Sequence, residues 1–246
     1  MSKTENSIVI SVVIPMYNES SIIEDTALTL HKYMTECFGE GRFEILFSND
    51  GSIDGCDDIV QGLDLSGVAV TGYKNNRGKG CAVRTAFLEA KGKYVMFTDA
   101  DLAYGTDVIG RVYETFIENP DADMVIGSRN LNKDGYEGYT FLRKLASKMY
   151  IKVLCLASGF KLTDSQCGCK AFTGIVAKKI FSKCEVDGFA FDFEAILWAQ
   201  KLGAKICEMP VKVINHRESK VRMVRDTVKM LKDLHKMKKR IKKQSI

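Results

Sequence analysis

The sequence lacks the features that mark a secreted or membrane-spanning chain. It has three prolines and one tryptophan in 246 residues, and its longest uncharged run is residues 6–18. That run is far shorter than the ~20 apolar residues of a membrane-spanning helix. The N-terminus has no apolar segment followed by a cleavage site, so we expect no secretory signal and no membrane span.

The eight cysteines form no C-x-x-C pair, and the only close pair is Cys167 and Cys169. A single C-x-C without a second pair does not complete a zinc site. Several cysteines lie among apolar residues, as buried free thiols do. We therefore expect reduced thiols in a cytosolic protein. With 46% hydrophobic and 27% charged residues, the chain can bury a sizeable core without disulfides.

Common nucleotide-binding motifs are also missing. The P-loop pattern G-x-x-x-x-G-K-[ST] does not occur, and "PMYNES" stands where a G-x-G-x-x-G turn would follow the first strand. The glycine-rich N-terminal loop of nucleotidyltransferases is absent as well. These absences argue against a P-loop NTPase, a dinucleotide oxidoreductase and a nucleotidyltransferase.

What the sequence does contain is a regular alternation of strand and helix patterns. Residues 8–14 are a β-branched run typical of a buried parallel strand, which we expect Pro15 to end. Further strands are predicted at residues 42–50, 67–73, 94–97 and 122–129. Helices are predicted between these strands at about 21–37, 81–90 and 107–118. A further helix is predicted to begin near Asp54, whose carboxylate suits an N-cap. This alternation predicts an α/β fold with a mostly parallel sheet flanked by helices.

The second half is less regular. We predict a helix at about 140–157, a loop entering a short strand at 162–172, a loop and helix at 187–203, and a strand at 205–214. Polar clusters follow the first strands at 17–19, 50–52, 75–79, 99–101 and Arg129. Because ligands bind beyond the carboxyl ends of parallel strands, these clusters predict the site.

Asp99 and Asp101 directly follow the predicted strand at 94–97. Residues i and i+2 of an extended chain share a side, so both carboxylates point to one face. Hard oxygen ligands suit Mg²⁺ or Mn²⁺. The alternative is a helix cap together with a solvated turn acid. The presence of Asp50 at a neighbouring strand end favours the metal.

Eight motifs in order resemble the family 2 inverting glycosyltransferases of GT-A (Rossmann-like) fold, and among them the dolichyl-phosphate glucosyltransferases and dolichol-phosphate mannose synthases. The motifs are "VVIPMYNES", "SNDGSIDG", "NNRGKGCAV", "FTDADLAYG", "VIGSR", "DSQCGCKAF", "FAFDFEAI" and "HRESKV". The resemblance covers about residues 8–222. Each motif alone is weak evidence, but their order is highly specific.

The resemblance implies a nucleotide-sugar donor and a divalent cation, Mg²⁺ or Mn²⁺, that Asp99 and Asp101 hold against the diphosphate. It implies that the donor and its cation are bound by Pro15, Tyr17, Glu19, Asp50, Lys79, Asp99, Ala100, Asp101 and Gln166. It implies catalytic roles for Asp101, Arg129, Asp164, Asp192, Arg217 and Lys220.

Several of these residues carry more specific expectations. The resemblance places Arg129 and the cluster of Arg217, Ser219 and Lys220 near the sugar diphosphate or an acceptor phosphate. Asp164 and Gln166 fall in the loop that closes over the sugar. Asp192 and Glu194 match the F-D-x-E segment, and a salt bridge or helix cap is an equal alternative for both.

The sequence departs from the mannose synthases at Ala103, where they often carry a glutamine as a third metal ligand. This difference favours UDP-glucose as the donor, with GDP-mannose next. A lipid-phosphate acceptor has a second pKa of ~6, so it is an anion at neutral pH and requires cations rather than a base. The candidate cations are Arg129, Arg143, Arg217 and Lys220.

A glycan or glycolipid hydroxyl is the alternative acceptor, and it requires a carboxylate base such as Asp192 or Asp164. A non-catalytic sugar-nucleotide-binding protein is a third possibility, against which the intact D-x-D pair and Asp50 argue.

The C-terminal segment is strongly basic. Residues 217–246 contain 12 Lys/Arg and 3 Asp/Glu, against 24 and 28 in residues 1–216. Apolar residues recur at steps of three and four from Val221 to Ile241, which predicts an amphipathic helix. We therefore expect a GT-A catalytic domain at 1–216 and a basic amphipathic helix at 217–246.

That helix suits an anionic membrane surface, and we expect a cytoplasmic protein that is peripheral at the membrane face. The alternative is a helix that packs its apolar stripe on the body. No nucleic-acid-binding module accompanies the basic segment, so we expect no nucleic-acid partner.

Overall fold

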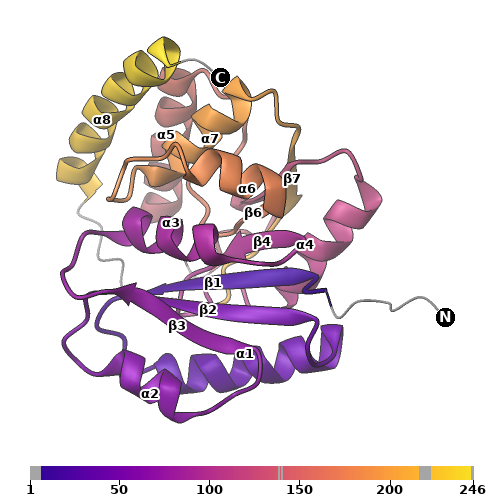
Figure 1. The fold of residues 1–246 in the computed structure, drawn as a ribbon. Helices are drawn as coiled ribbons and strands as arrows, with labels where there is room; N and C mark the ends of the chain where they lie inside the picture. The colour runs from indigo at the N-terminus through magenta and orange to yellow at the C-terminus, as the bar shows by residue number, and fades with distance from the viewer. Residues whose placement is uncertain (1–6, 138, 140, 216–222, 245–246) are drawn as a thin grey trace.

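The computed structural model describes residues 7–137, 139, 141–215 and 223–244. Within them, seven strands form one sheet in the order β3-β2-β1-β4-β6-β5-β7 (Figure 1). The strands are β1 (Ile10–Met16), β2 (Phe43–Asp50), β3 (Val68–Tyr73), β4 (Tyr94–Phe97), β5 (Met124–Ser128), β6 (Lys170–Thr173) and β7 (Ile206–Pro210). Only β6 runs antiparallel to its neighbours, which confirms the mostly parallel sheet.

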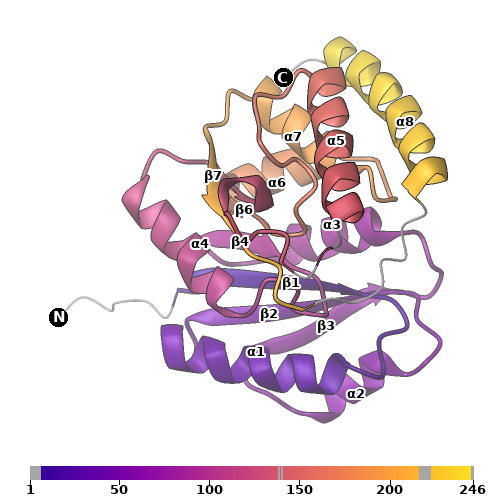
Figure 2. The same ribbon diagram turned by 180° about the vertical axis from the view of Figure 1, so that it is seen from behind.

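Helices cover both faces of the sheet. They are α1 (Ile23–Phe38), α2 (Cys56–Gly62), α3 (Lys79–Glu89), α4 (Asp107–Glu118), α5 (Phe141–Ser158), α6 (Gly174–Phe181), α7 (Phe191–Lys201) and α8 (Met223–Lys243). Figures 1 and 2 show α1 and α2 on one face and α3, α6 and α7 on the other. Of the helices in the described residues, none is both long and apolar enough to cross a membrane.

The two faces of the sheet form two separate cores. Along β1, Val13 belongs to the core under α3, α6 and α7, whereas Val12 and Ile14 belong to the core under α1, α2 and α4. Adjacent residues of a strand point to opposite faces, and both faces here are covered. This explains why the strand sequences read as continuous apolar runs rather than alternating ones.

The strand order reverses beside β1, in the part of the sheet formed by the first four strands. The chain moves outward from β1 to β2 and β3, then returns to place β4 on the other side of β1. Such a switch in direction is where parallel α/β sheets bind ligands, and Asp99 lies directly beyond β4.

Two local predictions were wrong. Pro15 does not end β1, which continues to Met16 and pairs Pro15 with Ser48 of β2. Its missing N–H is tolerated because β4 pairs with β1 only as far as Val13. Asp54 is not the N-cap of α2, because Gly55 occupies that position. The Asp54 carboxylate still accepts hydrogen bonds from the backbone N–H groups of Cys56 (3.2 Å) and Ser20 (2.8 Å).

The apolar stripe of α8 packs on the body of the protein. Leu234, Met237 and Ile241 are buried in the core that α7 shares, while Lys239 and Lys242 are exposed. In the described part of α8, the structure therefore contains the second alternative, a helix that packs its apolar stripe on the body rather than on a membrane. Val221 and the predicted domain boundary at 216/217 lie outside the described residues.

We predict that Gly80→Ala lowers the free energy of unfolding by about 1–3 kcal/mol, as overpacking does. Helix propensity alone would favour alanine by about 1 kcal/mol. However, a Cβ at position 80 would lie 2.5 Å from the carbonyl oxygen of Val186 and 2.6 Å from Cβ of Phe191. Urea unfolding measures the change.

The matched control is Gly62→Ala at the end of α2, where an added Cβ has no neighbour within 4 Å. We expect that variant to be unchanged or slightly stabilised. If both variants shifted equally, the close packing around Gly80 would not be what limits this position.

Candidate active site

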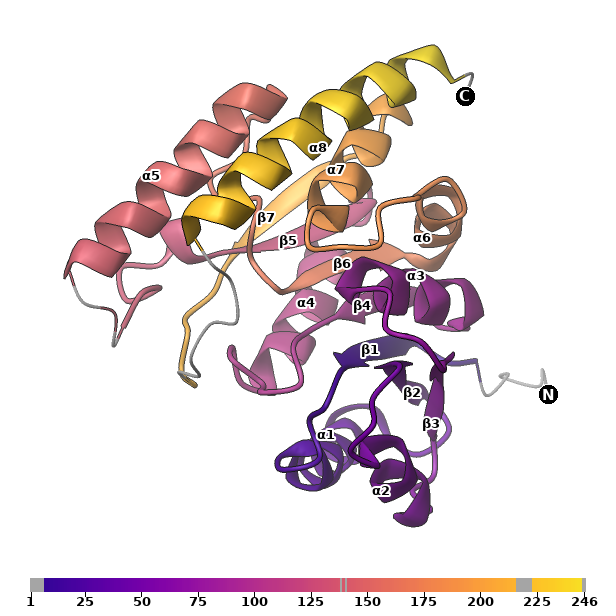
Figure 3. The same cartoon turned by 90° about the vertical axis from the view of Figure 1, so that its left-hand side faces the viewer.

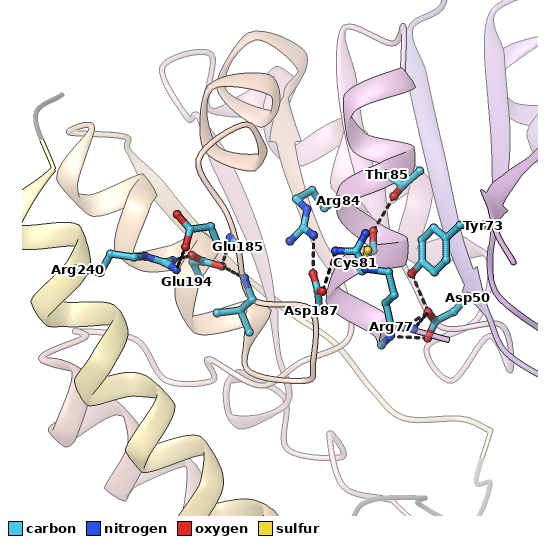
Figure 4. Close-up of polar contacts among 12 residues, drawn as sticks. Asp50, Tyr73, Arg77, Cys81, Arg84, Thr85, Glu185, Asp187, Glu194 and Arg240 are labelled. Atoms are coloured by element: carbon cyan, nitrogen blue, oxygen red, sulfur yellow. Dashed lines mark hydrogen bonds and ion pairs between the residues drawn. The ribbon is translucent and has the colours of Figure 1, made fainter. Parts of the chain in front are cut away.

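The loop between β3 and α3 is organised around Asp50, the last residue of β2. The buried carboxylate accepts hydrogen bonds from the Tyr73 hydroxyl (2.7 Å), the Asn76 side-chain amide (2.9 Å) and the backbone N–H groups of Arg77 and Gly78 (both 2.9 Å). Figure 4 shows part of this arrangement. Asp50 therefore shapes the loop that precedes α3, and its direct contact with a nucleotide stays a prediction.

A second segment, residues 185–188 between α6 and α7, crosses the N-terminus of α3. The backbone N–H of Cys81 donates to the Asp187 carbonyl at 3.1 Å. The Asp187 carboxylate pairs with Arg77 (3.0 Å) and Arg84 (2.5 Å) (Figure 4). Burial alone would raise the pKa of Asp187, but the hydrogen bonds from the two guanidinium groups outweigh it and lower that pKa. The segment is thus fixed on α3.

Glu194 holds the same segment from the side of α7. Its buried carboxylate accepts hydrogen bonds from the backbone N–H groups of Glu185 (2.9 Å) and Val186 (2.7 Å). It also pairs with Arg240 of α8, which reaches Glu185 as well (Figure 4). For Glu194, the salt-bridge alternative is therefore the arrangement that the structure contains.

The turn that carries Asp99 and Asp101 has a constrained backbone. Leu102 has φ of +48°, a value that residues other than glycine rarely adopt. The Ala103 N–H donates to the Asp101 carboxylate (3.1 Å), and the Ala100 carbonyl accepts the Thr26 hydroxyl of α1 (2.7 Å). Strained backbone that is held by such contacts is common at functional sites.

Positive and negative side chains alternate behind this turn. Asp99 forms an ion pair with Lys79, the first residue of α3. Asp192 of α7 forms another with Lys170 at 2.9 Å. Both ammonium groups lie over the Phe97 ring, at 5.6 and 5.7 Å from its centroid. We define Lys79, Asp99, Lys170 and Asp192 as the charge cluster.

Burial and charge act together on the pKa values in this cluster. Burial lowers the pKa of Lys79, but the charges of Asp99, Asp192 and Asp101 more than compensate, so that pKa is raised. Burial raises the pKa of Asp192, and Lys170 and Lys79 only partly oppose it. Lys79 therefore stays charged, and Asp192 is a stronger base than an exposed aspartate.

Sequence reasoning missed Lys170. Its ammonium is fully buried, pairs with Asp192 and donates to the Cys167 carbonyl at 2.6 Å. A lysine inside an apolar strand requires a buried partner. The position of this lysine among the apolar residues of "CGCKAF" could therefore have predicted a buried ion pair.

Arg129 and Asp164, both predicted to be catalytic, bind each other. The guanidinium donates two hydrogen bonds to the fully buried Asp164 carboxylate, at 2.7 and 3.0 Å, and the Arg129 backbone N–H adds a third at 3.2 Å. The N–H of Gln166 donates to the same carboxylate at 3.0 Å. Arg129 is thus neutralised within the protein, and Asp164 is poorly placed to accept a substrate proton.

The remaining predicted residues lie around the same edge or outside the described chain. Tyr17 is exposed directly after β1, Pro15 precedes it within the strand, and the Glu19 carbonyl accepts the N–H groups that begin α1. Arg217, Ser219 and Lys220 lie outside the described residues. The side chain of Arg143, on α5, is likewise not among those described.

The fit of a divalent cation rests on Asp99 and Asp101. No group of three or more His, Cys, Asp or Glu side chains converges within the described residues. A Cβ at Gly168 would lie 2.3 Å from Asp99 Oδ2, so this glycine leaves the carboxylate its room. Mg²⁺ is commonly held by one or two carboxylates together with substrate phosphates. The two aspartates therefore suit a cation that completes its coordination on a diphosphate.

Comparisons with known proteins agree with this geometry. The sequence profile described as "Glycosyl transferase family 2" matches residues 11–181. The dolichyl-phosphate beta-glucosyltransferase of Dictyostelium discoideum is 32% identical over 244 residues, which cover 93% of this chain and 73% of that protein. The enzyme of the same name from Saccharomyces cerevisiae is 30% identical over 249 residues, covering 94% and 74%.

A solved structure of similar fold is glucosyl-3-phosphoglycerate synthase from Mycobacterium tuberculosis in complex with Mn²⁺, UDP and phosphoglyceric acid. It matches with a TM-score of 0.71 and 17% identity, over 97% of this chain and 80% of that one. At that identity the likeness concerns the fold alone, and it confirms the expected GT-A fold.

We predict that Asp164→Asn lowers the free energy of unfolding by about 3–5 kcal/mol, because it leaves the Arg129 charge without its buried partner. Urea unfolding of Asp164→Asn, Arg129→Met and the double variant gives the coupling energy of the pair. We expect the double variant to lose less stability than the sum of the single losses. Native stability combined with lost turnover in Asp164→Asn would instead identify Asp164 as a base.

Proposed function

The chain belongs to glycosyl transferase family 2 and is a glycosyltransferase, and we propose that it transfers glucose from UDP-glucose to a polyprenyl phosphate of dolichyl type at a membrane surface, with Mg²⁺ or Mn²⁺ as cofactor. The observation that carries the proposal is the turn with Asp99 and Asp101 at the switch point of the sheet, beside Lys79.

Glycosyl transfer requires that the departing diphosphate be stabilised as its charge develops. A divalent cation held by Asp99 and Asp101 would supply that stabilisation. Lys79 adds a positive charge at the N-terminus of α3, where the helix dipole also favours an anion. The loop shaped by Asp50 and the segment at 185–188 hold this helix terminus in position.

The paired state of Asp164 supports a phosphate acceptor. A phosphate monoester is already an anion at neutral pH, with a second pKa of ~6, so no general base is needed. The curated relatives named above are dolichyl-phosphate glucosyltransferases, and Ala103 agrees with a UDP-sugar donor. The second candidate acceptor is a glycan or glycolipid hydroxyl, which the raised pKa of Asp192 favours.

We assign the contact with the membrane surface to the outer face of α5. Leu145, Met149 and Leu156 are 47%, 60% and 73% exposed. Their spacing of four and seven residues places them on one side of the helix. The exposed Lys148 and Lys152 accompany them. An exposed apolar stripe bordered by cations is complementary to an anionic lipid surface.

Helix α8 lies alongside α5 (Figure 3) and exposes Lys238, Lys239 and Lys242. Its apolar stripe is buried where it is described, so we assign the apolar contact to α5 and an electrostatic contact to α8. Each cation near an anionic surface contributes about 1 kcal/mol.

We predict that Asp101→Asn lowers turnover by about 100-fold or more, because the cation's several kcal/mol of charge stabilisation is weakened. Transfer of radiolabelled glucose from UDP-glucose to polyprenyl phosphate, counted in the organic phase, measures the loss. Asp107→Asn, an exposed acid at the start of α4, is the control and should keep its activity. Full activity in Asp101→Asn would refute the metal assignment.

The same assay tests the donor and the acceptor. GDP-mannose in place of UDP-glucose should give less product. Label that appears only in water-soluble product with a glycan acceptor would favour the hydroxyl alternative.

We predict that replacing Leu145, Met149 and Leu156 together by serine weakens binding to anionic vesicles by about 10-fold or more, since burying each side chain contributes about 1.5–3 kcal/mol. Cosedimentation with phosphatidylserine-containing vesicles measures binding. Ile175→Ser is the control, because Ile175 of α6 is 74% exposed but lies elsewhere in the fold. Unchanged binding of the triple variant would remove α5 from the contact.

A further inference from the structure

We infer that Lys79 competes with the divalent cation for Asp99, so that the cation binds tightly only together with the donor diphosphate. The inference rests on the proposed function, because it concerns the cation and diphosphate of that site. Its starting point is that one of the two predicted metal ligands, Asp99, is the ion-pair partner of a lysine from a different segment.

The backbone at Lys79 cannot withdraw from the site. A Cβ at Gly78 would lie 2.5 Å from the Asp187 carbonyl oxygen, and one at Gly80 would lie 2.5 Å from that of Val186. The segment at 185–188 therefore encloses the start of α3 closely on both sides of Lys79. Only the side chain of Lys79 can move away from Asp99.

A divalent cation and the Lys79 ammonium oppose each other at Asp99. Both are attracted to the same carboxylate, and they repel each other across a short distance. The Lys79 ammonium must therefore leave Asp99 when a cation takes its place on that carboxylate. Binding of the cation alone thus requires Lys79 to find another anion.

The other carboxylates near Lys79 do not serve that purpose without cost. Asp192 is paired with the fully buried Lys170 at 2.9 Å. Asp101 is the second predicted ligand of the cation itself. A donor diphosphate resolves the conflict, because its oxygens can bind the cation and accept hydrogen bonds from the displaced ammonium at the same time.

The consequence is a thermodynamic coupling between cation and diphosphate. Each must raise the affinity of the other by the same factor. Removing the ammonium removes the competition, so the cation should bind better alone and gain less from the diphosphate. If Asp192 were freed from Lys170, it could pair with the displaced Lys79 ammonium. The cation should then also bind better without the diphosphate.

The test is Mn²⁺ binding to the full chain, stripped of divalent cations and titrated by calorimetry or electron paramagnetic resonance, with and without UDP. We expect UDP to tighten Mn²⁺ binding in the wild type by a factor within about 5–150, the usual range of such couplings. Lys79→Met should tighten Mn²⁺ binding without UDP by about 10-fold and reduce the effect of UDP. Lys79→Arg, which keeps the charge and holds a carboxylate at least as firmly, should not tighten Mn²⁺ binding without UDP.

Two further variants separate the cause from a folding defect. Lys170→Met leaves Lys79 in place but frees Asp192 to receive it, so Mn²⁺ binding without UDP should tighten here too. Lys91→Met removes an exposed lysine beyond the other end of α3 and should change nothing. Unfolding curves identify any variant that does not fold, in which case the comparison among Lys170→Met, Lys79→Arg and wild type decides.

The outcomes distinguish this inference from the proposed function. If UDP tightens Mn²⁺ binding in the wild type but neither Lys79→Met nor Lys170→Met tightens it without UDP, the competition is refuted and the metal-dependent function stands. If Mn²⁺ does not bind even with UDP, the metal assignment fails and the inference fails with it.

Discussion

A buried carboxylate without a partner costs several kcal/mol, and the carboxyl edge of this sheet carries many carboxylates. Asp99 is paired with Lys79, Asp164 with Arg129, Asp192 with Lys170 and Glu194 with Arg240. Asp50 is instead neutralised by N–H and hydroxyl donors of one loop. Each partner comes from another segment of the chain, so satisfying these charges brings the segments of the site together.

These ion pairs also differ in how firmly they hold the carboxylates. Asp164 is enclosed by a bidentate guanidinium contact and accepts the N–H of Gln166, so its carboxylate holds Arg129 and Gln166 in position. Asp99 is one-third exposed, and its partner is a flexible ammonium. An ammonium can be displaced by a cation more readily than a planar, two-point guanidinium contact. The site thus combines rigid pairs that build it with one exchangeable pair at its centre.

On the outer surface, the neighbouring helices α8 and α5 differ in which apolar side chains they expose. Helix α8, where its side chains are described, buries Leu234, Met237 and Ile241 and exposes lysines, whereas α5 keeps large apolar side chains exposed beside its lysines. Arg240 links α8 to Glu194 and thereby to the segment that encloses the start of α3. The proposed membrane face and the proposed donor site are therefore built from connected elements.

The sequence by itself determined the alternation of strands and helices, the clusters of polar residues at the strand ends and the D-x-D pair, because these patterns are local and follow the periods of strand and helix. It also identified the family through the order of its motifs. The local predictions at Pro15 and Asp54 were wrong. Whether a strand can continue through a proline depends on the neighbouring strand, and which residue caps a helix depends on the conformation of the loop before it.

Only the tertiary structure decided which charges meet and which apolar faces are covered. The antiparallel β6 enters between β4 and β5, and Arg129 reaches Asp164 across 35 residues. Likewise, α5 buries Ile151 and Cys155 but leaves Leu145, Met149 and Leu156 exposed, whereas Leu234, Met237 and Ile241 of α8 are all buried. Ion pairs and packing join segments that are distant in the chain, and no local period records which segment will be the neighbour.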